Sequence, residues 1–129
     1  MALPTGHRAA RKKFVGLKDL DGELLIMPSK DLSPSIHQMI AAAVLKNHMP
    51  LDRYQMEEHF QTGINLTKAR VGYMFLPSSA KDFVPDGVVL RTPGFSIGPL
   101  ETFARWSGGN VDPLVHRVLG LLKEIKREL

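Results

Sequence analysis

Apolar positions in the first third of the chain predict two short strands around a tight turn. The apolar runs over residues 14–17 and 23–27 flank a turn that contains Asp21 and Gly22. An Asp-Gly pair supplies the positive φ that tight hairpin turns require. A lone hairpin is marginally stable in water, so it must pack against other elements. We therefore expect a small N-terminal β-hairpin covered by helices.

Beyond residue 30 the apolar residues recur mostly with the period of a helix. Ser33 and Pro34 are typical of a helix start, and Pro50 ends the apolar face that follows them. Further helices are predicted over residues 52–61, from Asn65 to about Tyr73, and over residues 99–106, with a short strand over residues 87–91. The helix that begins at Asn65 has an alternative, because residues 71, 73 and 75 also alternate as a strand would.

The last helix has the clearest pattern. Asp112 is placed to cap it, Pro113 takes its first position, and an apolar stripe continues to Leu129. If this stripe is exposed, it forms a surface for a protein partner or a homodimer. The alternative is that the helix closes the core. The residues predicted for this partner surface are Trp106, Leu114, Val118, Leu122 and Ile125.

Length and composition limit the fold to one small domain. The chain has 129 residues, is 43% hydrophobic and contains no cysteine, which excludes disulfides and cysteine-ligated metal sites. We expect a basic flexible arm over residues 1–12 and a single globular domain over residues 13–129. The predicted class is a helix-dominated α+β fold, in which the hairpin packs with about five helices.

Positive charge concentrates at the N-terminus. The net charge is +4, and no acidic residue precedes Asp19. An acid-free basic segment attracts polyanions, although a solvated tail has the same composition. The residues predicted to hold phosphates of a nucleic acid are Arg8, Arg11, Lys12 and Lys13.

Residues 52–75 form a candidate helix-turn-helix. Thr62, Gly63 and Ile64 would make the turn between two helices. The stretch resembles the helix-turn-helix superfamily, which implies DNA binding through the second helix. It departs from that pattern at His59 and Gly72, and an ordinary helical hairpin of the core is the alternative. The residues predicted to face the nucleic acid are Thr67, Lys68 and Arg70.

Catalytic and metal-binding motifs are weak. Ser96 lies in a G-x-S-x-G sequence, with Asp112 and His116 later in the chain, in the order that hydrolases use. The chain is too short for the parallel sheet that such a hydrolase needs. The histidines at 37, 48 and 59 have no metal-ligand spacing. We therefore predict no enzymatic activity, no metal and no cofactor.

The longest apolar run, Met39–Leu45, is far shorter than the roughly 20 residues of a membrane span. We expect a cytoplasmic protein without a membrane partner. The predicted function is that of a small, non-enzymatic nucleic-acid-binding protein in transcription regulation. The alternative is a protein-interaction module (adaptor, inhibitor or assembly subunit) that docks or dimerises through the last helix.

Overall fold

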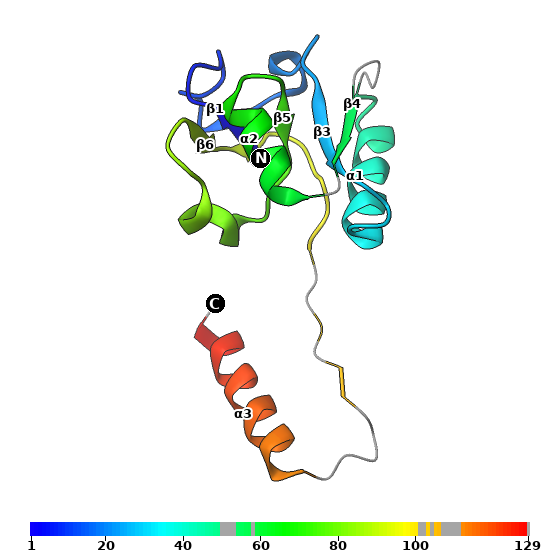
Figure 1. Cartoon of the computed structure of the whole chain (residues 1–129), viewed down its shortest axis with the longest axis vertical. Helices are drawn as coiled ribbons and strands as arrows, with labels where there is room; N and C mark the ends of the chain where they lie inside the picture. Colours follow the sequence, from blue (N-terminus) through cyan, green and yellow to red (C-terminus); the bar gives the residue numbers. More distant parts are fainter. Residues whose placement is uncertain (50–53, 58, 101–102, 104, 107–111, 129) are drawn as a thin grey trace.

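A five-stranded sheet with a helix on each face forms most of the structure (Figure 1). The computed structural model describes the chain except for residues 50–53, 58, 101–102, 104, 107–111 and 129. The sheet has the order β4-β3-β5-β1-β6. Its strands are β1 (Ala2–Pro4), β3 (Leu25–Pro28), β4 (Tyr54–Glu57), β5 (Tyr73–Met74) and β6 (Val88–Leu90). The α-helices are α1 (Pro34–Lys46), α2 (Phe60–Lys68) and α3 (Pro113–Glu128).

Along the chain, β3 is followed by β4 at one edge of the sheet and then by β5 on the opposite side of β3. Strand β3 is parallel to β4 on one side and to β5 on the other, whereas β1 is antiparallel to both β5 and β6. Helix α1 connects β3 to β4, and α2 connects β4 back to β5 on the far side of β3. Because such crossovers are right-handed, a change of direction places the two helices on opposite faces of the sheet.

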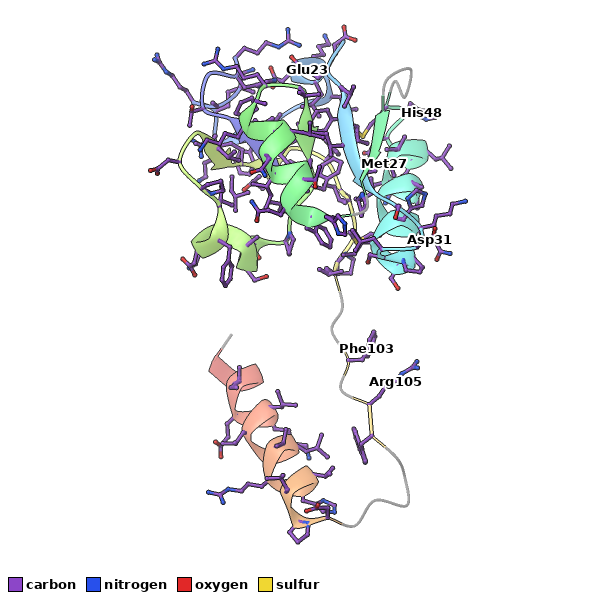
Figure 2. All side chains as sticks on the ribbon, viewed as in Figure 1. Glu23, Met27, Asp31, His48, Phe103 and Arg105 are labelled. Atoms are coloured by element: carbon purple, nitrogen blue, oxygen red, sulfur yellow. The ribbon has the colours of Figure 1, made fainter. Side chains whose placement is uncertain are left out.

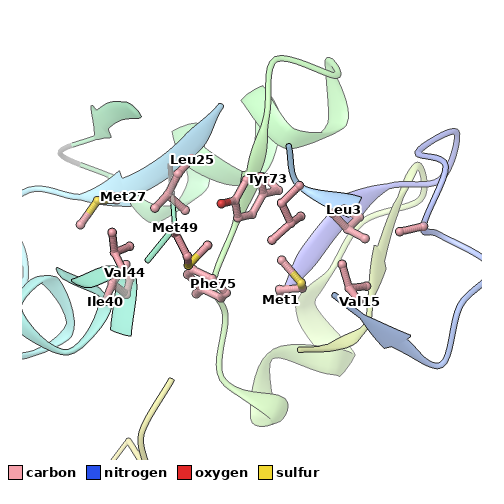
Figure 3. Close-up of a cluster of buried hydrophobic side chains, with 12 residues drawn as sticks. Met1, Leu3, Val15, Leu25, Met27, Ile40, Val44, Met49, Tyr73 and Phe75 are labelled. Carbon is pink, nitrogen blue, oxygen red and sulfur yellow. The ribbon is translucent and has the colours of Figure 1, made fainter. Parts of the chain in front are cut away.

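Alternating side chains divide the core into two clusters, one on each face. In β3, Leu25 and Met27 pack with Val44 of α1, whereas Ile26 packs with Ile64 of α2. Strand β1 divides in the same way. Figure 3 shows the cluster on the α1 face of the sheet, which includes Leu25, Met27 and Val44. This alternation is the period of two expected for a strand that is buried on both faces.

Gly63 allows α2 to lie close to the sheet. A Cβ atom at this position would approach the Cε atom of Met74 to 3.1 Å and Cγ2 of Ile26 to 3.3 Å. Glycine inside a helix is unfavourable for the backbone, but here its missing side chain permits close packing. The sequence-based prediction that Gly63 lies in a turn between two helices is therefore wrong.

A second, two-stranded sheet pairs β2 (Phe14–Val15) with β7 (Thr92–Pro93) in parallel. Two short 3-10 helices, η1 (Leu17–Asp19) and η2 (Ser78–Phe83), complete the elements of the described residues.

Helix α3 stands apart from the sheet and its two covering helices (Figure 1). The Asp112 carboxylate accepts a 2.8 Å hydrogen bond from the Leu114 N–H, so the predicted cap and start of this helix are confirmed. Its apolar stripe does not close the core. Phe103 and Arg105 are also exposed on the segment that precedes α3 (Figure 2). Exposed apolar residues of the helix are Leu114, Val118, Leu121, Leu122 and Ile125.

The structure confirms the predicted α+β class, the predicted helix after Ser33 (α1) and the predicted strand within residues 87–91 (β6). The N-terminal hairpin is wrong, because β2 pairs with β7, and β3 pairs with β4 and β5. Gly22 does adopt the predicted positive φ, at 74°. Residues 98–100, 103, 105 and 106 have no regular structure, and the rest of the helix predicted over residues 99–106 lies outside the described residues.

The flexible arm predicted over residues 1–12 needs correction. Ala2 and Leu3 are fully buried in β1, which pairs with strands on both sides, and Ala9 is also fully buried. An apolar strand flanked by two partners gains both ladder hydrogen bonds and burial, which outweighs the conformational entropy of a free terminus.

The described residues of the 52–75 stretch do not form the candidate helix-turn-helix. Residues 54–57 form strand β4, and the predicted turn lies inside α2. The predicted second helix ends at Lys68, and β5 follows at Tyr73. Periodicity alone could not separate helix from strand in these short apolar runs, and pairing with β3 decided both. Among the described residues, no helix is long and apolar enough to cross a membrane.

Candidate ligand cleft

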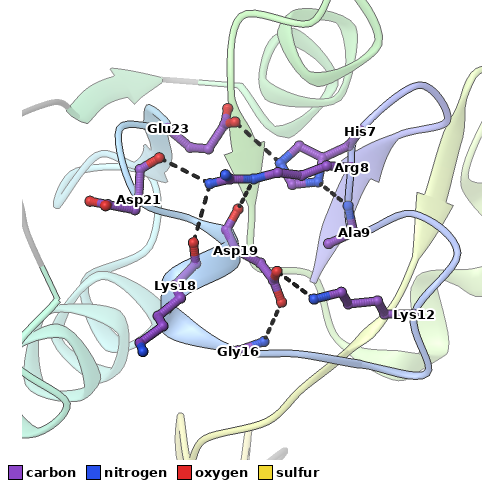
Figure 4. A network of polar contacts seen from close by, with 9 residues as sticks. All are labelled: His7, Arg8, Ala9, Lys12, Gly16, Lys18, Asp19, Asp21 and Glu23. Atoms are coloured by element: carbon purple, nitrogen blue, oxygen red, sulfur yellow. Dashed lines mark hydrogen bonds and ion pairs between the residues drawn. The ribbon is translucent and has the colours of Figure 1, made fainter.

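The predicted nucleic-acid residues do not gather on one element. Arg8 binds the protein's own backbone (Figure 4): its Nε donates to the carbonyl of Asp19 at 3.0 Å, and its Nη2 donates to the carbonyls of Lys18 and Asp21 at 3.2 Å each. The guanidinium therefore holds the loop that contains η1 against the N-terminal segment.

Lys12 is also engaged within the chain. Its Nζ lies 2.6 Å from Oδ1 of Asp19, whose Oδ2 accepts a hydrogen bond from the Gly16 N–H (Figure 4). The Lys12 hydrogen bond, followed by the Gly16 hydrogen bond, lowers the pKa of Asp19 below its ordinary value. By contrast, Arg11 and Lys13 are exposed beside a hollow near β7.

The three residues predicted from the helix-turn-helix lie near the C-terminal end of α2. Thr67 is fully buried, so it contacts the protein interior and cannot reach a nucleic acid. The stem of Lys68 lies along Gly87, and the guanidinium of Arg70 lies over Gly6. Arg70 has a φ of 64°, which marks the turn that ends the helix and leads toward β5.

The predicted partner residues remain accessible. Trp106 is 54% exposed, and a hollow of about 260 Å³ lies between the Arg105–Trp106 segment and the apolar side of α3. The residues of α3 that line this hollow are Leu114, Val115, Val118, Leu119 and Leu122.

A larger cleft, which the sequence analysis did not anticipate, lies at the carboxyl edge of the parallel strands. Its volume is about 500 Å³. Residues 75–79, which follow β5, form one side, and Ile36 and Met39 of α1 form another. Met1, which directly precedes the antiparallel strand β1, also lines it, and Phe60 lines it from the start of α2. In open α/β sheets, ligands bind beyond the carboxyl ends of the strands, where the strand order reverses.

Aromatic rings form the base of this cleft. Phe75 is only 6% exposed, and its ring packs edge-to-face on Phe95 with 6.3 Å between the ring centroids. Tyr73 makes a similar contact with Phe75 at 5.8 Å. These two edge-to-face contacts fix the orientation of the Phe75 ring at the base of the cleft.

The outer wall of the cleft is fixed to the body at two points. The Gly94 N–H donates to the Val15 carbonyl at 2.8 Å, and Nδ2 of Asn47 donates to the Ser96 carbonyl at 3.0 Å. These bonds hold the segment that carries Phe95 and Ile97 beside α1. The wall is therefore positioned by hydrogen bonds to its own backbone groups, as expected for a preformed ligand site.

The polar side-chain groups of the cleft are hydroxyls. Ser78, Ser79 and Thr92 carry them, and no lining residue among those described has a charged side chain. The composition is suited to a small, mainly apolar and uncharged molecule with one or two hydrogen-bonding groups. The sequence indicated this site only weakly. Alternating strands and helices favour a parallel sheet, and such sheets bind ligands at the carboxyl ends of their strands.

Ser96 does not lie on a nucleophile elbow. It is exposed on an irregular segment after β7, whereas an elbow joins a strand directly to a helix. His37 binds within the fold, since its Nδ1 lies 2.9 Å from the Pro28 carbonyl. In the described part of the chain, no group of three His, Asp or Glu residues could hold a metal ion.

Comparison with known proteins shows only that the fold of this chain is similar to that of a solved structure. No protein-family model matches the sequence, and no curated protein matches it significantly. The chain is similar to a crystal structure from Pseudomonas aeruginosa described as a "putative LysR family transcriptional regulator". The TM-score is 0.53, the sequence identity is 22%, and the match covers 78% of this chain. The matched part is 34% of the length of the regulator.

Proposed function

We propose that this chain is a non-enzymatic regulatory module that binds a small molecule in the cleft at the carboxyl edge of its sheet. The observation that carries this proposal is the position of the cleft, beyond β3 and β5, where the order of the strands reverses. The fold likeness to a protein described as a transcriptional regulator supports a role in transcription regulation.

The lining chemistry defines the ligand class. Phe60, Phe75 and Phe95 offer ring surfaces, and the hydroxyls of Ser78, Ser79 and Thr92 offer hydrogen bonds. An aromatic or aliphatic molecule with a hydroxyl or carbonyl group fits this set. A ligand that buries a carboxylate here is disfavoured, because no cationic side chain lines the cleft, and burial lowers the pKa of the Met1 amino group to about 6, so that it is mostly neutral at pH 7.

The NMR signals of the methionine methyl groups provide the test, because some methionines line the cleft and others do not. Phenol serves as a minimal probe, with an expected dissociation constant on the order of 1 mM. In methyl NMR spectra of the full chain, phenol should shift the signals of Met1 and Met39, which line the cleft, and leave that of Met27 unchanged. Benzoate should shift them much less. Unchanged Met1 and Met39 signals at saturating phenol contradict the proposal.

A matched pair of variants locates the binding. Phe95→Ala removes a ring of the cleft and should weaken phenol binding. Phe83→Ala removes a ring that is 81% exposed on η2 and does not line the cleft, so it should leave binding unchanged. Equal loss in both variants would place the probe elsewhere.

A second candidate function is self-association through α3, favoured by the exposed stripe. Arg117 and Glu124 are exposed at equal distances on either side of the Gly120–Leu121 pair. Antiparallel pairing of two copies would therefore place Arg117 of one copy beside Glu124 of the other. Leu121 lies at the centre of the exposed stripe, where the two copies would pack against each other.

Direct nucleic-acid binding and a cytoplasmic location stay predictions. Of the residues predicted to contact phosphates, Arg11 and Lys13 are exposed and unpaired with any carboxylate among the described residues. Their surroundings lead to a more specific hypothesis.

A further inference from the structure

We propose that the hollow beside β7 is a binding site for the phosphate group of a small phosphorylated molecule. Its volume is about 370 Å³, and it is separate in chemistry from the apolar cleft. Four cationic residues and no acidic residue line it. The lining residues are Arg11, Lys12, Lys13, Leu90, Arg91 and Thr92.

Arg91 is the centre of this site. Its Nε donates to the Ala10 carbonyl and its Nη1 donates to the Leu90 carbonyl, both at 2.7 Å. Ala10 is itself buried, so the guanidinium is fixed against a rigid part of the fold. Carbonyl groups orient a guanidinium without neutralising it. The remaining Nη2 group keeps donors in a defined direction for an oxyanion.

The charge of Arg91 has no carboxylate partner within the described chain. There, Lys12 pairs with Asp19, and Glu23 lies 3.3 Å from Nε2 of His7. A half-buried cation without a counter-charge is costly, and a bound anion would remove that cost. An anion at this position therefore gains more than it would at a fully exposed arginine.

Arg11 and Lys13 add charge around the fixed guanidinium. Both are exposed, and the Lys13 ammonium lies 5.5 Å from the centroid of the Phe14 ring, which restricts where its stem runs. Lys12 contributes less, because it is already paired with Asp19. Three unpaired cations favour a dianion over a monocarboxylate, since each oxygen of a phosphate can accept a charge-assisted hydrogen bond.

A single phosphate group suits this site better than a nucleic-acid backbone. The other residues predicted to contact a nucleic acid are occupied elsewhere: Arg8 binds backbone carbonyls, and Thr67 is buried. A duplex binder makes several phosphate contacts along an extended surface. The hollow concentrates its donors in one place.

The test is calorimetric titration of the full chain with inorganic pyrophosphate. Saturable binding with one site is expected. The double variant Arg11→Gln with Lys13→Gln should weaken it by about tenfold or more, corresponding to about 1.4 kcal/mol. Both residues are exposed, so this variant should fold normally. Arg91→Lys keeps the charge but loses the fork of donors, and should also weaken binding.

The matched control removes the same charge from another part of the surface. Lys30 and Lys46 are exposed and do not line the hollow, so Lys30→Gln with Lys46→Gln should leave affinity nearly unchanged. An equal loss in both double variants would overturn the proposal, because it would show only the effect of net charge. Absence of saturable pyrophosphate binding would also overturn it.

A labelled DNA duplex forms the second arm. We expect pyrophosphate to bind and the duplex to bind only weakly, with a steep dependence on salt. Duplex binding that depends on Arg11 and Lys13 without pyrophosphate binding would replace this proposal with a nucleic-acid site. Because the phenol test uses different residues, the two proposals can fail independently.

Discussion

The hydroxyl of Thr67 donates a 3.0 Å hydrogen bond to the carbonyl of Gly63, one turn earlier in α2. Both residues are on the side of the helix that packs against the sheet. The sequence pattern predicts that Thr67 faces a nucleic acid from the second helix of the candidate helix-turn-helix. Its actual role is to fill the interface between helix and sheet while satisfying its own polar group.

Thr67→Val should reduce the free energy of unfolding by about 1 kcal/mol, because it keeps the volume and removes the buried hydrogen bond. Thr62→Val is the matched control, since Thr62 is exposed in the same helix. It should change stability by less than about 0.5 kcal/mol. Urea unfolding of the three proteins measures both effects. Equal values for the two variants would contradict the assigned role of Thr67.

Gly72→Ala should be strongly destabilising. A Cβ atom at Gly72 would overlap with the carbonyl oxygen of Leu24, a backbone atom that cannot move aside without distorting the chain. The same carbonyl accepts the Tyr73 N–H at 2.9 Å, which joins β5 to the residue before β3. We expect a loss of about 2–4 kcal/mol or failure to fold.

Gly120→Ala provides the contrast to Gly72→Ala. Nothing lies within 4 Å of a Cβ atom at Gly120, and the residue is inside α3. Alanine favours the helix by about 0.5–1 kcal/mol. Circular dichroism should show equal or greater helix content in this variant. A stabilising Gly72→Ala substitution would contradict the close approach of the two backbone segments.

Asp19 should make folding stability depend on pH in the acidic range. Its folded pKa is lowered from 3.8 by the Lys12 and Gly16 hydrogen bonds. The contribution is therefore fully present above about pH 3.8, the unfolded value, and is lost as the pH falls through the lower folded pKa. Asp19→Asn should destabilise the protein more at pH 7 than at pH 2.

Asp21→Asn is the control for this pH effect. Asp21 binds Arg8 through its backbone carbonyl, which the substitution keeps. Its effect on the urea midpoint should be small at both pH values. A pH-independent effect of Asp19→Asn would mean that the Lys12–Asp19 pair does not persist in solution.

Substitutions on α3 test self-association. Leu122→Asp places a charge in the exposed stripe and should convert a concentration-dependent dimer into a monomer in light scattering. Lys123→Asp introduces the same side chain one position away, off the apolar stripe, and should leave the dimer intact. Arg117→Glu should weaken the dimer, and adding Glu124→Arg should restore it. A monomer at every concentration of the unmodified chain would refute this candidate.

The sequence by itself determined the elements with strong local signals. Helix α1 begins at Pro34, directly after Ser33, although the Ser33 side chain makes no capping hydrogen bond. Helix α3 follows from the Asp112 cap and Pro113, because caps and first-turn prolines act on the nearest backbone groups. The positive φ of Gly22 was equally local. Their physical causes lie within a few residues of the chain.

Only the tertiary structure decided the remaining parts. The segment around Tyr54 is a strand because it pairs with β3, and β1 is part of the sheet because it pairs with β5 and β6, which are distant in the sequence. Those pairings assembled the cleft and the hollow from segments dozens of residues apart. Local propensity is worth tenths of a kcal/mol per residue in short apolar runs, so burial and strand pairing across the fold override it.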